Sequence, residues 1–99
     1  TTSHPLFHIV YDLPEKLQVP NAGVCDGSPN CRTWETDDSC TEHEVLFWDG
    51  GGQDGKILLL YNSDFGDGIE WADDPDYPVR YTVYAYKFFV NVITYSLTH

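Results

Sequence analysis

The 17-residue run YTVYAYKFFVNVITYSL, residues 81–97, limits the fold more than any other stretch, because it contains no glycine and no proline. Its β-branched and aromatic residues favour a strand, but strands in globular proteins are usually only about 3–10 residues long. Apolar positions also recur at i, i+3, i+4, i+7 and i+8, which is the spacing of one helix face. The positions on that face are Ala85, Phe88, Phe89, Val92, Ile93, Ser96 and Leu97. The run therefore predicts a long C-terminal α-helix.

Three shorter segments have the composition of strands. EVLFW at residues 44–48 and KILLLY at residues 56–61 are separated by a glycine-rich stretch, which predicts a β-hairpin. LFHIVYDL at residues 6–13 mixes β-branched and aromatic residues and is followed by Pro14, so a further strand is predicted there. The three leucines at residues 58–60 are continuous rather than alternating, which indicates a strand buried on both faces and covered by further layers.

The chain has 99 residues, which is the size of one small domain spanning residues 1–99. It has 16 acidic against 5 basic residues, a net charge of −11. This charge argues against nucleic acid and anionic lipid as partners, since both attract basic surfaces. No stretch is long and apolar enough to span a bilayer. The chain has no methionine, so we expect that Thr1 follows a cleavage or that the sequence is a fragment.

The three cysteines, Cys25, Cys31 and Cys40, lie in a polar, turn-rich segment that is predicted to be a long loop over residues 14–43. One disulfide, with one thiol left over, would pin this loop. It would also indicate an oxidising, extracytoplasmic compartment, periplasmic or secreted. A zinc site with His43 as the fourth ligand is the less favoured alternative, because the cysteine spacings of six and nine residues contain no C-x-x-C pair.

GVCDG at residues 23–27 has the G-x-C-x-G pattern of a nucleophile elbow. No buried strand precedes it, no helix-forming run follows it, and the expected His-x-Glu partner is missing. We interpret Cys25 as a disulfide cysteine in a turn. His4 and His8 are four residues apart, but on the predicted strand they would share a face at a distance of about 13 Å. Neither a metal pair nor a catalytic residue is therefore predicted.

The segment NSDFGDGIEWADDPDYP, residues 62–78, has six acids and no Lys or Arg. It directly follows an apolar strand, where open α/β sheets place their binding crevices. It is predicted to be a structured loop in which Asn62, Trp71 and Tyr77 pack on the domain while the acids face solvent or a partner. The candidate binding residues are Asn62, Asp64, Asp67, Glu70, Trp71 and Asp73. The register of a calcium-binding EF-hand loop is not met, so calcium is the less favoured alternative and no cofactor is predicted.

Three sequence patterns together resemble a known family. HPLFH opens the chain at residues 4–8. A glycine and an apolar strand then run into N-x-D-x-G-D-x-x-E-W-x-D-x-x-x-Y-P over residues 55–78, and the chain ends in N-V-I-T-Y-x-L-T-H at residues 91–99. In this order the patterns resemble the bacterial domain-of-unknown-function family numbered 4159, over nearly the whole chain.

The resemblance implies a fold and a location. It implies the flavodoxin-like α/β sandwich of the class I glutamine-amidotransferase-like superfamily, of which this chain would be the C-terminal half. The nucleophile position of that superfamily would lie upstream of Thr1, so no catalytic residue carries over. Members are often secreted or membrane-tethered. The expected fold is thus an amidotransferase-like half-domain with a mainly parallel sheet, a long Cys-rich loop and a C-terminal helix.

Three hypotheses for function follow. The first is a non-catalytic, extracytoplasmic binding or assembly subunit of a larger complex, whose partner is another protein or a missing N-terminal segment. The second is a degenerate hydrolase of the amidotransferase-like superfamily. The third is a calcium- or carbohydrate-binding module. We favour the first, and so a protein that is not an enzyme.

Overall fold

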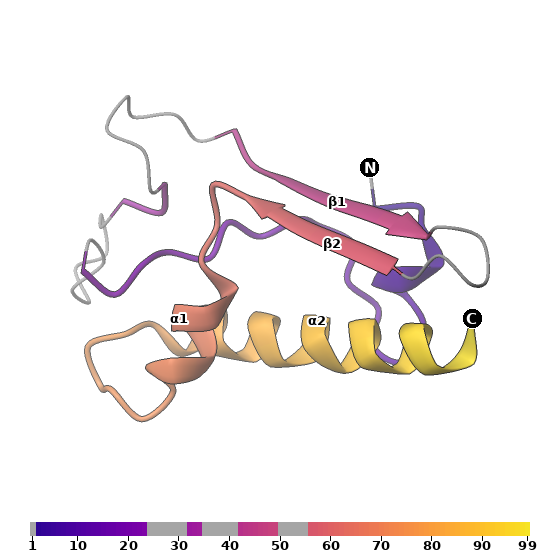
Figure 1. Cartoon of the computed structure of the whole chain (residues 1–99). Helices are drawn as coiled ribbons and strands as arrows, with labels where there is room; N and C mark the ends of the chain where they lie inside the picture. The colour runs from indigo at the N-terminus through magenta and orange to yellow at the C-terminus, as the bar shows by residue number, and fades with distance from the viewer. Residues whose placement is uncertain (1, 24–31, 35–41, 50–55) are drawn as a thin grey trace.

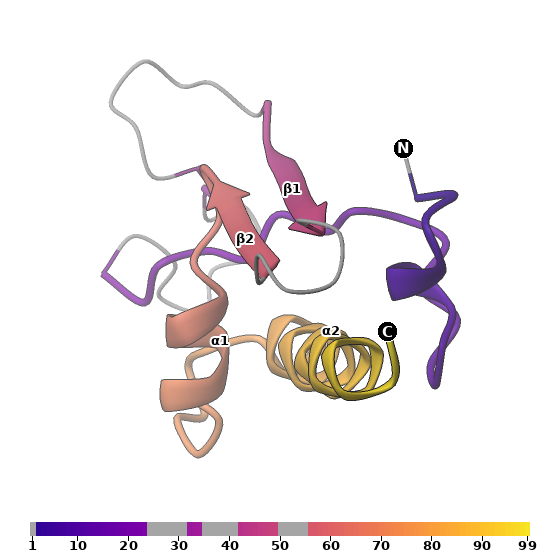
Figure 2. The same cartoon turned by 45° about the vertical axis from the view of Figure 1, so that its right-hand side comes forward.

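The computed structural model describes residues 2–23, 32–34, 42–49 and 56–99. Its elements are the 3-10 helix η1 (Pro5–Phe7), the strands β1 (Glu44–Asp49) and β2 (Lys56–Tyr61), and the helices α1 (Phe65–Glu70) and α2 (Val79–Thr98). The hairpin of β1 and β2 lies on one side of the core and α2 runs along the other (Figure 1). Seen nearly along α2, α1 and η1 flank that helix on opposite sides (Figure 2).

The predicted β-hairpin is confirmed. β1 and β2 pair antiparallel in a register that places Leu46 opposite Leu59 and Trp48 opposite Ile57. Side chains alternate between the two faces, as the pleat of a strand requires. The inner face packs against the core through four partly buried residues, Val45, Phe47, Leu58 and Leu60.

The predicted parallel, flavodoxin-like or amidotransferase-like sheet is wrong, because the sheet of the described residues has two antiparallel strands. Six residues separate β1 from β2, whereas a parallel pair needs a crossover of about a dozen or more. The prediction that residues 58–60 are buried on both faces is also wrong. Leu59 is 54% exposed, because one layer of core covers one side of the hairpin.

The predicted C-terminal helix is confirmed and is longer than expected. α2 begins after Pro78, whose fixed backbone angle suits a helix start, and ends at Thr98. Its core face comprises Tyr81, Thr82, Tyr84, Ala85, Phe88, Asn91 and Tyr95. The predicted face was right for Ala85 and Phe88, but Ile93 and Leu97 are exposed.

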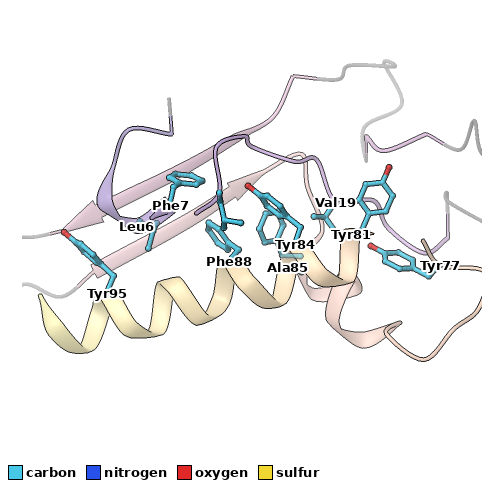
Figure 3. Packing of buried hydrophobic residues seen from close by; sticks show 11 residues of the cluster. Leu6, Phe7, Val19, Tyr77, Tyr81, Tyr84, Ala85, Phe88 and Tyr95 are labelled. Atoms are coloured by element: carbon cyan, nitrogen blue, oxygen red, sulfur yellow. The ribbon is translucent and has the colours of Figure 1, made fainter. Parts of the chain in front are cut away.

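The core is mainly aromatic. Phe65 of α1 meets Phe88 of α2 edge to face, with ring centroids 4.8 Å apart. The ring centroid of Phe7, in η1, lies 6.0 Å from that of Phe88. Figure 3 shows the side chains of Tyr84, Phe88 and Tyr95 pointing from α2 toward the hairpin and the N-terminal segment. Edge-to-face pairs of this kind add about 0.5–1.5 kcal/mol beyond the area they bury.

The predicted strand over residues 6–13 is wrong. Pro5 stands at the first position of η1, and the Nδ1 atom of His4 accepts a hydrogen bond from the Leu6 amide at 3.0 Å. Leu6 and Phe7 are both buried although they are adjacent. A strand with one covered face would bury only one of the two, whereas a helical turn can bury both.

Asn91 joins the N-terminal segment to α2. Its side chain is fully buried. It accepts hydrogen bonds from the amides of Val10 and Tyr11, at 3.2 and 2.9 Å, and donates one to the Tyr11 carbonyl at 2.9 Å. The opening and closing sequence patterns meet nearby, where the His4 ring lies 5.2 Å from the Tyr95 ring.

Candidate functional site

The acidic segment contains a short helix that the sequence did not predict. α1 covers residues 65–70, within what was expected to be a loop. The Asp64 carboxylate caps its start, because Oδ1 accepts a hydrogen bond from the Asp67 amide at 2.9 Å. Two glycines in six residues conceal this helix, since glycine is a poor helix former.

Asp64 and Asp67 also hold residues 19–22, which we call the crossing segment. The Asp64 amide donates to the Val19 carbonyl at 2.7 Å. The Oδ2 atom of Asp67 accepts from the Ala22 amide at 2.9 Å, and Oδ2 of Asp64 accepts from the Asn21 side chain at 3.2 Å. Both carboxylates are therefore engaged by donors of the protein itself, in bonds that link positions more than 40 residues apart.

Asn62 and Tyr77 both fix the acidic segment, residues 62–78, to the domain. Asn62 is buried with a φ of 54°, a left-handed conformation that asparagine tolerates better than most residues. Its side chain donates to the Glu42 carbonyl at 2.9 Å. The Tyr77 hydroxyl donates to the Pro20 carbonyl at 2.8 Å. Burial, together with the negative charges of Asp67 and Asp64, raises the pKa of Tyr77, so its hydroxyl keeps its proton.

The remaining candidate residues lie elsewhere. Trp71 caps the C-terminal end of α1 and is 38% exposed, so its side chain is only partly covered by the domain. Glu70 and Asp73 are exposed beside it. The structure thus divides the six candidates into an inner group of Asn62, Asp64 and Asp67 and an outer group of Glu70, Trp71 and Asp73. Among the described residues, no three His, Cys, Asp or Glu side chains lie together as a metal ion would need. The predicted disulfide cysteines, Cys25, Cys31 and Cys40, are outside the described residues.

His8, on the surface, makes polar contacts through both of its ring nitrogens. Its Nδ1 atom bonds the Asp12 carboxylate, and its Nε2 atom bonds the Thr2 carbonyl at 2.6 Å. A histidine that acts as a general base needs a nitrogen within reach of its substrate. Both ring nitrogens of His8 are engaged by the protein, so the arrangement fastens the N-terminus rather than offering a base.

His8 gives the protein a predictable pH dependence. The hydrogen bonds that the ring donates to the Asp12 carboxylate and, next, to the Thr2 carbonyl raise the pKa of His8 above the ordinary value of 6.5. Because the folded state binds this proton more tightly, the stabilisation is complete below about pH 6.5 and is lost as pH rises through the raised pKa. We expect the stability advantage of the wild type over His8→Gln, measured by urea denaturation, to shrink between about pH 5.5 and about pH 9. An advantage that is equal at both pH values would contradict this assignment.

An exposed apolar surface lies on the outer face of the hairpin, which we call the outer sheet face. It comprises Leu46, Trp48, Ile57, Leu59 and Tyr61, with exposed fractions of 51, 53, 59, 54 and 51%. Sequence reasoning missed it because the continuous leucines suggested burial on both sides. The signal that identifies it is the pairing of two strands with only one layer beneath them. A hollow of about 360 Å³ borders this face, between η1 and β1, lined by His4, Leu6, Phe7 and the residues 44–47.

Comparisons with known proteins give one match. Residues 1–97 match the family described as Domain of unknown function (DUF4159). No curated protein and no solved structure matches the chain. In the described part of the chain, no helix has the length and apolar character needed to cross a membrane.

Proposed function

This chain belongs to the DUF4159 family of domains of unknown function, and we propose that it is a binding or assembly subunit that receives a partner protein on the outer sheet face. The observation that carries the proposal is the exposure of five large apolar side chains on one side of a two-stranded sheet. Contiguous apolar surface of this kind marks interaction sites, whereas isolated exposed apolar residues do not.

The outer sheet face is continuous because of its register. Leu46 lies directly opposite Leu59, and Trp48 lies directly opposite Ile57. Cross-strand neighbours have Cβ atoms only about 4.5–5.5 Å apart. The face also includes two aromatic residues, Trp48 and Tyr61, and such residues are enriched at the centres of protein interfaces. Its composition therefore suits a protein partner.

The partner is a different protein with a basic rim around an apolar centre. With a net charge of −11 per chain, two copies of this protein repel one another. The same charge attracts a basic partner and speeds its association. Three cysteines in a polar segment support an extracytoplasmic location for such a complex. The described residues present no feature that favours the hydrolase or the calcium- or carbohydrate-binding alternative, so neither is proposed.

A single charge on the outer sheet face is expected to release the partner. Leu59→Glu places a carboxylate at the centre of the apolar face, whose burial against a partner is strongly unfavourable. We expect tagged wild-type protein to retain a partner from its own host and Leu59→Glu to retain at least about tenfold less, a loss of about 1.4 kcal/mol or more. The measurement is quantitative mass spectrometry of the retained proteins, followed by titration of the purified partner.

Val10→Glu is the matched control. Val10 is apolar and 51% exposed, as Leu46 is, but it lies outside the hairpin. It should retain the partner at the wild-type level. Circular dichroism should show that both variants are folded, since each changes an exposed side chain. Equal retention by Leu59→Glu and the wild type would contradict the proposal, and so would a wild-type protein that native mass spectrometry shows as a monomer without a partner.

A further inference from the structure

The side of α2 that faces away from the hairpin has a second apolar surface. Its exposed apolar residues follow one another at spacings of alternately four and three. They are Val79, Val83, Tyr86, Val90, Ile93 and Leu97, with exposed fractions of 71, 43, 48, 39, 59 and 82%. We call this row the α2 seam. Alternating spacings of three and four residues are those of a helix that packs along another helix, as in a coiled coil.

The α2 seam is separate from the core face of the same helix. The core face points toward the hairpin and η1, through residues such as Ala85 and Phe88, which are fully buried. Surface helices normally carry polar residues on the side opposite the core, and helices that are apolar all round are normally buried. α2 has the composition of a buried helix, yet the hairpin, α1 and η1 cover only part of its circumference (Figure 2).

The charges on α2 differ from those of the whole chain. Residues 79–98 contain no Asp or Glu, although the chain has 16 acids. They do contain Arg80 and Lys87, seven residues apart and therefore on the same side of the helix. Each directly follows a residue of the α2 seam. The Arg80 guanidinium lies 4.4 Å from the centre of the Tyr81 ring, and the Lys87 ammonium lies 5.4 Å from that of Tyr11.

A hollow of about 340 Å³ lies along this basic flank. Its lining residues are Leu13, Glu15, Leu17, Arg80, Val83, Tyr84 and Lys87. The leucines give it an apolar wall, and Val83 belongs to the α2 seam as well. The hollow therefore adjoins the α2 seam at Val83, and two cations against one carboxylate, Glu15, give its lining a local positive charge that suits an apolar side chain accompanied by carboxylates.

We propose that an amphipathic helix of a partner protein, with Asp or Glu flanking its apolar face, packs along the α2 seam. Its acids lie against Arg80 and Lys87, and one of its apolar side chains enters the hollow beside Val83. Recognition of an amphipathic helix by an apolar surface is a common binding mode, with anchors at i, i+3, i+4 and i+7. This interaction goes beyond the proposed function, because it uses a different surface from the outer sheet face.

Charge distinguishes this occupant from two others. A second copy of α2 has no carboxylate to offer Arg80 or Lys87, because the helix contains none. The net charge of −11 repels any anionic occupant, but an extended anionic lipid surface carries far more negative charge than the few flanking acids of one helix and is repelled more strongly. An acidic helix meets both the apolar row and the local positive charge.

The test uses two synthetic peptides of three heptads, with Leu at both apolar positions of each heptad. One peptide has Glu at the flanking positions and the other has Lys. Fluorescence anisotropy at about 0.15 M salt, where the distant acids of the chain are largely screened, should show that the wild type binds the Glu peptide at least about tenfold more tightly, since opposite flanking charges set partner choice. Ile93→Glu should weaken that binding at least about tenfold. Arg80→Glu/Lys87→Glu should reverse the preference between the peptides, while Leu59→Glu should bind as the wild type does.

Several results would overturn the inference. They are equal binding of the two peptides, binding of neither, or a loss of binding in Leu59→Glu that matches the loss in Ile93→Glu. Light scattering that shows a dimer abolished by Ile93→Glu would assign the α2 seam to a second copy. Sedimentation with phosphatidylglycerol vesicles that Ile93→Glu abolishes, without selective binding of the Glu peptide, would assign it to a membrane surface. Because Leu59→Glu and Ile93→Glu alter different surfaces, failure of either proposal leaves the other to be judged on its own.

Discussion

Asn91→Leu is expected to lower the free energy of unfolding by about 2–4 kcal/mol. Leucine has a similar volume, so the change removes hydrogen bonds without opening a large cavity. It leaves the amides of Val10 and Tyr11 and the Tyr11 carbonyl without the side-chain partner they have in the wild type. A buried polar group without a partner costs about 1–3 kcal/mol, and the partial exposure of this segment reduces the total. Urea denaturation followed by tryptophan fluorescence measures the loss.

Thr82→Val is the matched control on the same helix. Thr82 is 7% exposed, and its hydroxyl has no hydrogen-bond partner among the described residues. Valine has nearly the same shape without the hydroxyl, so this variant should be as stable as the wild type or slightly more stable. If Asn91→Leu costs no more than Thr82→Val does, Asn91 does not fasten the N-terminal segment to α2.

Gly68→Ala is expected to lower the free energy of unfolding by about 1–3 kcal/mol. A methyl group at this position would meet a Cγ atom of Val19 at 2.9 Å and the Cβ atom of Ala85 at 3.0 Å. Both neighbours are fully buried, so neither side chain can move into solvent. Gly68 is therefore the point where α1 comes close to α2 and to the crossing segment. Thermal or urea denaturation measures the effect.

Gly66→Ala is the control, because it makes the same change in the same helix. The nearest atom to a methyl group at Gly66 is an Asp64 carboxylate oxygen at 3.5 Å, an ordinary contact. Alanine is the better helix former by about 1 kcal/mol, so Gly66→Ala should be neutral or stabilising. Adding Val19→Ala to Gly68→Ala should relieve part of the clash and so recover part of the lost stability, although it also opens space in the core. Equal effects of the two glycine substitutions would contradict the close packing at Gly68.

The sequence predicted the elements that depend on local pattern. The length of the run at residues 81–97 identified α2, and two apolar segments around a glycine-rich stretch identified the hairpin. The prediction failed where contacts with the rest of the fold, rather than local pattern, determine the secondary structure. Side-chain capping by His4 and the burial of both Leu6 and Phe7 make η1 from residues with strand composition. Capping by Asp64 makes α1 from a segment with two glycines.

The candidate site was harder to predict because its contacts are not local. Asp64 and Asp67 bind donors more than 40 residues earlier in the chain, and no spacing in the sequence reveals such pairs. The α2 seam was missed for another reason. Two apolar rows share one helix, and the predicted face mixed residues of both, placing the exposed Ile93 and Leu97 with the buried Phe88.

Site-specific photocrosslinking tests the central claim most directly, that the outer sheet face receives a partner protein. A benzophenone amino acid replaces Leu59 in one variant and Val10, equally apolar but outside the hairpin, in another. On irradiation with the retained partner, we expect a single crosslinked heterodimer from the variant substituted at Leu59 and none from the variant substituted at Val10. Equal crosslinking at both positions, or none at Leu59 while the partner remains bound, would contradict the claim.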